Sequence, residues 1–257
     1  MAEAVRKTTK LVIFGVEDFA DIAYEYFTWD SDYEVVAFAV DRAYLEPGEC
    51  RKFGLPVVAF EDLRAAFPPE DHAFFAAVVY ADLNRLRERI CQRARQQGYR
   101  LARYVSSRAF VWRNATLGEH CFIFENNCVQ PYASIGDNVV LWCGNQISHH
   151  ARIGHHCFLS GSVAVGGWAN VGDHCFVGLN ATLANNTDLG ARSWVSHGAV
   201  LSGTVPPASF VSAGSSDIAA LDDARLALAL QRASQARKRH GAAAMAPAID
   251  GLNLPCD

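Results

Sequence analysis

The histidines of this chain are unevenly distributed, and one of them has neighbours suited to base catalysis. Six of the nine histidines lie between positions 120 and 174, and His149 is followed eighteen residues later by Gly167. An imidazole can take a proton from an amine or hydroxyl near neutral pH. A glycine amide lets a ligand approach the backbone and can hold a developing oxyanion. The pair predicts acyl transfer, whereas the alternative is that His149 is a surface turn residue.

A second set of residues with the same spacing invites a metal interpretation. The set contains His120, Asn138, His156 and His174. Each of these residues comes two positions after a glycine at which a tight bend of the chain is predicted, and Asn138 interrupts the series of histidines. We therefore expect exposed turn residues with their side chains in solvent, and no metal site.

The spacing has its origin in a six-residue repeat. An aliphatic residue occupies every sixth position from Val105 to Leu201 without a break, and the residue four positions later is small at most repeats. Such a run is far too long to arise by chance, because aliphatic residues are a minority of a typical chain. The pattern is typical of a hexapeptide-repeat β-helix, a solenoid with an inward aliphatic residue on every flat face.

Glycines mark a longer period within this repeat. They recur every eighteen residues at Gly118, Gly136, Gly154, Gly172 and Gly190. Three hexads therefore make one turn, so residues that differ by eighteen lie above one another on adjacent coils. We expect the glycines to supply the permissive backbone that a tight corner requires.

Before the repeat, the sequence alternates between apolar runs and helical patterns. The runs at 11–14, 35–40, 56–60 and 74–80 predict strands. Helices are expected after an N-cap at Asp18 and over about 84–97. Strands separated by helices predict a small parallel sheet of the doubly wound type, which binds ligands outside the carboxyl ends of its strands. Gly15 and Asp41 lie at such ends and are the candidate substrate-binding residues.

The composition limits the class of protein. The chain has 257 residues, a net charge of −4 and a pI near 6.1, which gives no basic surface for nucleic acid. There is no apolar run of about 18 residues to cross a membrane and no secretory signal, so we expect a cytoplasmic protein. The eight cysteines form no C-x-x-C pair and are expected to be free thiols.

These observations divide the chain into three parts. Residues 1–104 are expected to form an α/β substrate-binding domain of the Rossmann-like type, and residues 105–212 a left-handed parallel β-helix. Residues 213–257 are expected to form a helix, capped by Ser215 or Ser216, and a tail. The basic residues near the end of this helix suit the helix dipole and are expected to be solvated, and contact with the phosphates of coenzyme A is the alternative. They are Arg232, Arg237, Lys238 and Arg239.

The arrangement resembles a known family over about residues 10–212. An α/β domain followed by a hexapeptide solenoid is similar to the acyltransferases that acetylate nucleotide-linked amino sugars, including the sialic-acid O-acetyltransferase-like enzymes. The resemblance implies acetyl-CoA as co-substrate, a sugar that is nucleotide-linked, direct attack on the thioester, and a role in surface polysaccharide or glycan synthesis. It also implies a homotrimer, because the relatives complete each half-pocket with a neighbouring solenoid.

The resemblance assigns roles to several residues. His149 matches the general base, and Gly167 matches the glycine whose backbone binds the acetyl thioester. His150 replaces the family's usual aspartate and is an alternative base or a partner of His149. Asn185, next in the column of Gly167, and Phe158, where many members have a second histidine, are the other cofactor-site candidates.

The nucleotide end departs from the family pattern. The first turn reads Gly15-Val16-Glu17-Asp18, without a G-x-G-x-x-G, and Glu17 and Asp18 would repel a pyrophosphate at the helix N-terminus. Asp41 matches the acidic position after the second strand, although it could equally cap the strand end. A substrate other than a nucleotide sugar is therefore a second interpretation.

Two other functional classes are open at this stage. A γ-class carbonic anhydrase-like enzyme would need three converging zinc ligands. His120 and His156 are 36 residues apart, which resembles the spacing of two zinc ligands in that class. The third histidine ligand is expected five residues after His156, but that position is Gly161. A catalytically idle solenoid that only binds partners is the other alternative.

Overall fold

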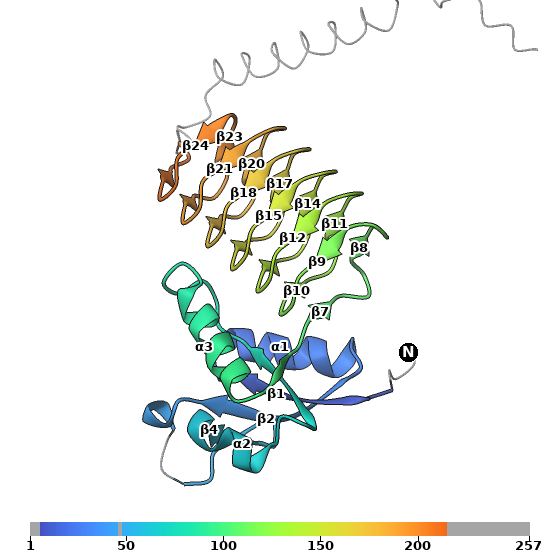
Figure 1. The fold of residues 1–257 in the computed structure, drawn as a ribbon, viewed down its shortest axis with the longest axis vertical. Helices are drawn as coiled ribbons and strands as arrows, with labels where there is room; N and C mark the ends of the chain where they lie inside the picture. The colour runs from blue at the N-terminus through green and yellow to red at the C-terminus, as the bar shows by residue number, and fades with distance from the viewer. Residues whose placement is uncertain (1–5, 46–47, 215–257) are drawn as a thin grey trace, which may run out of the picture. The chain divides into compact units, whose positions relative to one another are not determined.

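The computed structural model describes residues 6–45 and 48–214 (Figure 1). The predicted C-terminal helix lies outside the described residues. Among the residues described, no helix combines the length and the apolar character needed to span a lipid bilayer.

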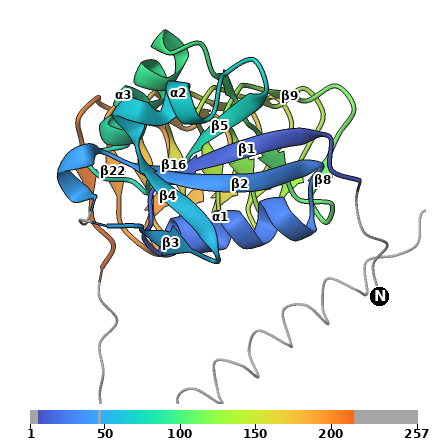
Figure 2. The same cartoon turned by 90° about the horizontal axis from the view of Figure 1, so that it is seen from below.

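The first part of the chain forms a six-stranded sheet in the order β3-β4-β2-β1-β5-β6 (Figure 2). Its strands are β1 (Thr9–Phe14), β2 (Tyr33–Val40), β3 (Arg51–Lys52), β4 (Leu55–Ala59), β5 (His72–Ala76) and β6 (Arg100–Leu101). All pairs are parallel except β3 with β4. The predicted strand at 74–80 ends earlier, at Ala76, because the chain leaves the sheet after the Ala77 N–H donates to the Phe14 carbonyl.

Three α-helices and two short 3-10 helices accompany this sheet. They are α1 (Asp18–Trp29), α2 (Leu63–Ala66), α3 (Arg85–Gln96), η1 (Arg42–Tyr44) and η2 (Phe60–Asp62). The helix expected over 84–97 is confirmed as α3. The expected N-cap at Asp18 is wrong by one residue: Asp18 is the first residue of α1, and Glu17 occupies the N-cap position without a side-chain capping hydrogen bond.

The second part is a parallel β-helix of two-residue strands, as the hexads predict. The first sheet contains β7 (Tyr104–Val105), β10 (Phe122–Ile123), β13 (Val140–Leu141), β16 (Phe158–Leu159), β19 (Phe176–Val177), β22 (Trp194–Val195) and β25 (Phe210–Val211). The second sheet contains β8 (Phe110–Val111), β11 (Cys128–Val129), β14 (Gln146–Ile147), β17 (Ala164–Val165), β20 (Thr182–Leu183) and β23 (Val200–Leu201). The third contains β9 (Thr116–Leu117), β12 (Ser134–Ile135), β15 (Arg152–Ile153), β18 (Asn170–Val171), β21 (Asp188–Leu189) and β24 (Thr204–Val205).

The strand register confirms that three hexads make one coil. Phe122 pairs with Val140 and Ile123 with Leu141, eighteen residues further on. The final coil is shorter, because Leu189 pairs with Val205 and Trp194 with Phe210. The inward aliphatic and small residues of all coils form a continuous buried core.

The corner glycines serve a different purpose from the one expected. The left-handed backbone conformation falls two residues later, at Asn138 (φ 58°) and His156 (φ 58°). A Cβ added to Gly136 would lie 2.8 Å from the Gly154 carbonyl carbon, and one added to Gly154 would lie 2.8 Å from the Asp173 nitrogen. The glycines are therefore required because adjacent coils approach each other too closely for a side chain.

The outward residues of the first sheet face the α/β domain. Phe122, Phe158 and Phe176 belong to one buried cluster with Phe19 and Phe27 of α1. The rings of Phe27 and Phe122 lie 5.6 Å apart, edge to face. The two parts of the described chain therefore share an aromatic core.

Replacing Gly136 with alanine tests the close approach of the coils. The added methyl group overlaps the next coil's backbone, so we expect Gly136→Ala to lower the free energy of unfolding by about 1–3 kcal/mol in urea denaturation. Gly214→Ala is the matched control, because no atom lies within 4 Å of its added Cβ. Equal stability of the two variants would contradict this account of the corners.

Candidate functional site

His149 lies at the corner between β14 and β15, where its side chain is exposed. A Cβ added to Gly167 would lie 2.7 Å from His149 Cε1 and 2.9 Å from Nε2. The imidazole thus lies directly against the glycine of the next coil. The structure brings this predicted pair together, and any side chain at position 167 would displace the ring.

The Gly167 amide is engaged in this structure. Its N–H donates to Asn185 Oδ1 at 2.8 Å. Asn185 is exposed, so its side chain is free to rotate. A thioester carbonyl can reach the Gly167 donor only when Asn185 releases it.

His150 is held beside His149 by two aromatic rings. Its ring stacks on Trp168, with centroids 4.0 Å apart, and on Tyr132, with centroids 4.8 Å apart. The Nδ1 atoms of His149 and His150 lie 3.2 Å apart, so one ring must donate and the other accept. The backbone N–H of His149 donates to Gln130 Oε1 at 3.0 Å. These contacts fix both imidazoles in position.

Sequence reasoning did not identify Tyr132 and Trp168. Both have positive φ values of 62°, the left-handed conformation that recurs at the corners of the solenoid. The signal was present in the sequence, because both belong to the eighteen-residue column of His150.

Phe158 does not join this corner. It is only 4% exposed, lies on the first sheet, and contacts Tyr80 and Phe176 with centroid distances of 5.0 and 5.9 Å. In the residues described, its position serves the aromatic core between the two parts of the chain.

Gly15 and Asp41 lie at the carboxyl ends of β1 and β2, as predicted. Gly15 has φ of 116°, and a Cβ there would lie 2.8 Å from the Ala77 carbonyl oxygen. Asp41 makes no capping hydrogen bond to η1, and its Oδ1 lies 2.7 Å from Arg93 Nη2. Asp41 thus occupies the N-cap position of η1 without a side-chain capping hydrogen bond, and its carboxylate is paired with Arg93 instead.

A cavity of about 270 Å³ opens beside these two strand ends. Its lining includes Val16, Val40, Tyr44, Arg51, Lys52 and Val57. Val40 and Val57 belong to strands that the sequence predicts, whereas Tyr44, Arg51 and Lys52 lie between β2 and β4 and were not identified from the sequence. We call this space the edge cavity.

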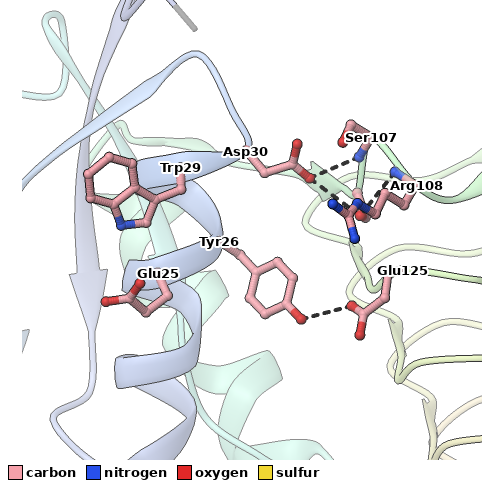
Figure 3. A pocket seen from close by; sticks show the side chains of 8 residues that line it. Glu25, Tyr26, Trp29, Asp30, Ser107, Arg108 and Glu125 are labelled. Carbon is pink, nitrogen blue, oxygen red and sulfur yellow. Dashed lines mark hydrogen bonds between the residues drawn. The ribbon is translucent and has the colours of Figure 1, made fainter. Parts of the chain in front are cut away.

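A larger cavity, of about 440 Å³, lies elsewhere (Figure 3). It is lined by α1 and by the solenoid corners at Ser107 and Glu125, which connect the first sheet to the second. His149 lies at a different corner, which connects the second sheet to the third. Tyr26 donates to Glu125 Oε2 at 2.8 Å, and burial together with this bond raises the pKa of Tyr26 to about 12. These polar groups are occupied in joining α1 to the solenoid.

Asp30 makes the second polar connection at this cavity. Its Oδ2 accepts hydrogen bonds from the Tyr104 hydroxyl at 2.5 Å and from the Ser107 N–H at 2.9 Å. Burial alone would raise the pKa of Asp30, but these hydrogen bonds hold it below the ordinary value. The carboxylate therefore remains charged and bound to the first coil.

The prediction that the histidine row is exposed to solvent is wrong. His120 and Asn138 are 1% and 2% exposed, and His156 and His174 are half-buried. Helix α3 covers this corner. Arg87, which is fully buried, donates through Nε to Asn138 Oδ1 at 2.8 Å and through Nη2 to the Asn138 carbonyl at 2.6 Å.

The hydrogen bonds in this row have a fixed direction. The Ala76 N–H donates to His120 Nε2 at 2.9 Å, so the ring proton lies on Nδ1 and is donated to Asn138 Oδ1 at 2.8 Å. The Asn138 amide then donates to His156 Nδ1 at 2.9 Å. His156 therefore carries its proton on Nε2, which faces Glu88 Oε1 at 3.6 Å.

This direction bears on the metal interpretation. Glu88, His156 and His174 are close enough together to hold an ion. However, His156 Nε2 carries a proton in the network, and both nitrogens of His120 are already hydrogen-bonded. These side chains are therefore better suited to hydrogen bonds that join α3 to the solenoid than to binding zinc.

Burial makes this junction sensitive to acid. It lowers the pKa of His120 to about 3 and that of His156 to about 4, and it lowers the pKa of Arg87 to about 10. The unfolded chain binds protons at these histidines near pH 6.5, whereas the folded chain does not. The free energy of unfolding therefore falls as the pH drops from about 6.5 toward 4.

Replacing His120 with glutamine tests this dependence. We expect the wild type to lose about 1.4 kcal/mol per pH unit below 6.5 from His120 alone, measured by urea denaturation at pH 7.5 and 4.5. His120→Gln should be less stable at pH 7.5 but lose less on acidification. His155→Gln, at the exposed neighbouring position, is the control that should keep the wild-type slope. An unchanged slope in His120→Gln would contradict the assignment.

Solved structures share this fold. No protein-family model matches the sequence, and the search of curated proteins found no match. The acetyltransferase domain of PglB from Neisseria gonorrhoeae FA1090 is 19% identical, with a TM-score of 0.67, over 79% of this chain and 96% of that one. PerB from Caulobacter crescentus, in complex with CoA and GDP-perosamine, is 23% identical, with a TM-score of 0.67, over 78% and 92%.

A third structure extends the same likeness. WeeI from Acinetobacter baumannii AYE is 18% identical, with a TM-score of 0.52, over 80% of this chain and 97% of that one. The PglB domain has also been solved in complex with acetyl coenzyme A. The predicted combination of an α/β domain and a hexapeptide solenoid is thus the fold of known acetyltransferases.

Proposed function

We propose that this protein transfers the acetyl group of acetyl-CoA to an amino or hydroxyl group of a sugar, with His149 as general base. The observation that carries the proposal is the His149 imidazole lying against Gly167, on a fold shared with acetyltransferases. Related structures with acetyl-CoA, or with CoA and GDP-perosamine, support the class of co-substrate and acceptor.

The histidine pair supplies the base in the required tautomer. His149 Nε2 lies at the Gly167 backbone, where the acceptor and thioester would meet. For Nε2 to accept a proton, the ring proton must lie on Nδ1 and be donated to His150 Nδ1, 3.2 Å away. His150 thus takes the part of an orienting carboxylate, as a positioning residue.

The reaction then follows from these contacts. The acceptor nitrogen or oxygen attacks the thioester carbon while its proton passes to His149 Nε2. The oxyanion accepts a hydrogen bond from the Gly167 N–H, after Asn185 Oδ1 has moved away from that N–H. When the carbon–sulfur bond breaks, the CoA thiolate leaves and takes the proton from His149.

We also propose a homotrimer in the cytoplasm. His149 is exposed, so a single chain provides only one wall of a pocket. Large apolar side chains are exposed on the solenoid near this corner, including Tyr132 and Trp168 at 62% and 58%. A neighbouring solenoid would cover them and enclose the CoA arm. The seven cysteines among the described residues are free, which agrees with a reducing compartment.

The acceptor has two proposed forms. The related structure with GDP-perosamine favours a nucleotide-linked sugar, whereas the acidic first turn of this chain favours a small acceptor without a nucleotide.

Removing the His149 imidazole tests the catalytic proposal. We expect His149→Ala to lower kcat at least 100-fold, measured as CoA thiol release with a panel of amino sugars, because a positioned base contributes roughly 10²–10⁴. His155→Ala removes an exposed imidazole from another corner and should retain activity. Full activity of His149→Ala, or stoichiometric zinc in the active protein, would refute the mechanism.

Sedimentation tests the assembly. We expect a species of three times the chain mass of 28.1 kDa at micromolar concentration. The substitution Trp168→Ser should weaken this association, because it removes exposed apolar area at the proposed contact. A stable monomer with full activity would contradict the shared-site arrangement.

A further inference from the structure

We propose that the proton taken from the acceptor is relayed from His149 to His150, whose positive charge is then held between the rings of Trp168 and Tyr132. This inference rests on the proposed acyl transfer and gives positioning roles to two aromatic residues. It is carried by the contacts of three successive coils at one corner of the solenoid.

The three rings form one stack because they occupy the same place in successive coils. Tyr132, His150 and Trp168 are eighteen residues apart and have φ values of 62°, 59° and 62°. The His150 N–H donates to the Pro131 carbonyl at 3.2 Å. The Trp168 N–H donates to the His149 carbonyl, also at 3.2 Å. Identical backbone conformations on hydrogen-bonded coils thus hold the three side chains in register.

Both faces of the His150 ring are covered by aromatic rings. The Trp168 ring lies on one face, with centroids 4.0 Å apart and 11° between the planes. The Tyr132 ring, on the coil before, has a centroid distance of 4.8 Å and an angle of 21°. The π-electrons of an aromatic ring stabilise a cation within about 6 Å of the ring centre, and tryptophan does so most strongly. The stack is therefore suited to hold an imidazolium at His150.

The His149 ring has a different environment. It is exposed and lies against the backbone of Gly167. Its contact with His150 is edge to face, with 83° between the planes. A positive charge on His149 therefore has no aromatic face beside it among the described residues, whereas a charge on His150 has two.

No carboxylate is paired with either imidazole in residues 6–45 and 48–214. The ion pairs that histidines make there belong to His155, His156 and His174. A base that gains a proton without an adjacent negative charge needs another source of stabilisation. The rings of Trp168 and Tyr132 supply it at this corner.

The contact between the two imidazoles provides the path of the proton. Their Nδ1 atoms lie 3.2 Å apart, and before the reaction His149 donates its Nδ1 proton to His150 Nδ1. When His149 Nε2 takes the acceptor's proton, the Nδ1 proton moves to His150, which becomes an imidazolium while His149 is neutral again. The leaving CoA thiolate then takes the proton from His149 Nε2, and His150 returns its Nδ1 proton to His149.

Substitutions at Trp168 test the role of the stack. Trp168→Leu removes the ring but keeps an apolar side chain, so we expect kcat for CoA thiol release to fall about tenfold, with KM for acetyl-CoA within about twofold of the wild type. Trp168→Phe keeps a ring and should retain most of the wild-type kcat. Phe210→Leu removes an exposed ring from the last coil and should leave kcat unchanged.

The substitution His150→Asp separates charge stabilisation from packing. Aspartate tolerates the left-handed backbone, and its carboxylate can accept the His149 Nδ1 proton without the help of a ring. We expect His150→Asp to keep kcat within about tenfold of the wild type. Adding Trp168→Leu to it should then change kcat by less than about twofold, whereas a role in packing or assembly would cost the same in both backgrounds. Melting curves and sedimentation show whether each variant is folded and assembled.

Nitrogen-15 NMR of labelled imidazoles tests the resting tautomers without any substrate. We expect the wild type to carry the proton on Nδ1 of His149 and on Nε2 of His150. This readout does not depend on catalytic activity.

Four results would overturn the inference. They are an equal loss of kcat from Trp168→Leu in both backgrounds, an effect of Trp168→Leu confined to KM, a folded but inactive His150→Asp variant, and a resting proton on Nε2 of His149. Failure of the proposed function appears separately, as a wild type that releases no thiol from acetyl-CoA with any acceptor.

Discussion

The stacking of identical coils governs the rest of this molecule. Each coil lies directly on the next through parallel hydrogen bonds, so along the regular coils a residue lies beside the residue eighteen positions away. A glycine on one coil therefore leaves room for atoms of the adjacent coil, whether side chain or backbone. The contact of His149 with Gly167 is one instance, and the close approach of Gly136 to Gly154 is another. The same rule that builds the core thus builds the candidate site.

The α/β domain attaches to this scaffold through two kinds of contact. Aromatic rings from α1 pack on the first sheet, whereas α3 inserts the fully buried Arg87 into a directed series of hydrogen bonds. An uncharged aromatic contact tolerates small shifts, but a buried guanidinium satisfied by carbonyl and amide oxygens does not. The polar contacts therefore set the register between the strand ends near Gly15 and the coil that carries His149.

The sequence was sufficient for the features that depend on periodicity. The hexads predicted the solenoid, the coil length and the meeting of His149 with Gly167, because stacking makes these properties local. Three features escaped prediction. The burial of His120 depends on α3, which is distant in sequence, and nothing in the helix distinguishes Arg87 from the other arginines of α3. The contact of Asn185 with the Gly167 amide depends on a side-chain rotamer, which no spacing specifies.

The shortened last coil has a consequence for how the solenoid ends. A parallel β-helix leaves open strand edges at its final coil, and such edges can recruit further chains. Here Pro206 and Pro207 occupy the corner before β25, and the backbone of Gly190 packs against Pro207. Proline has no backbone N–H to offer. The coil stack is therefore self-terminating at this corner, which opposes fibre-like growth of one solenoid upon another.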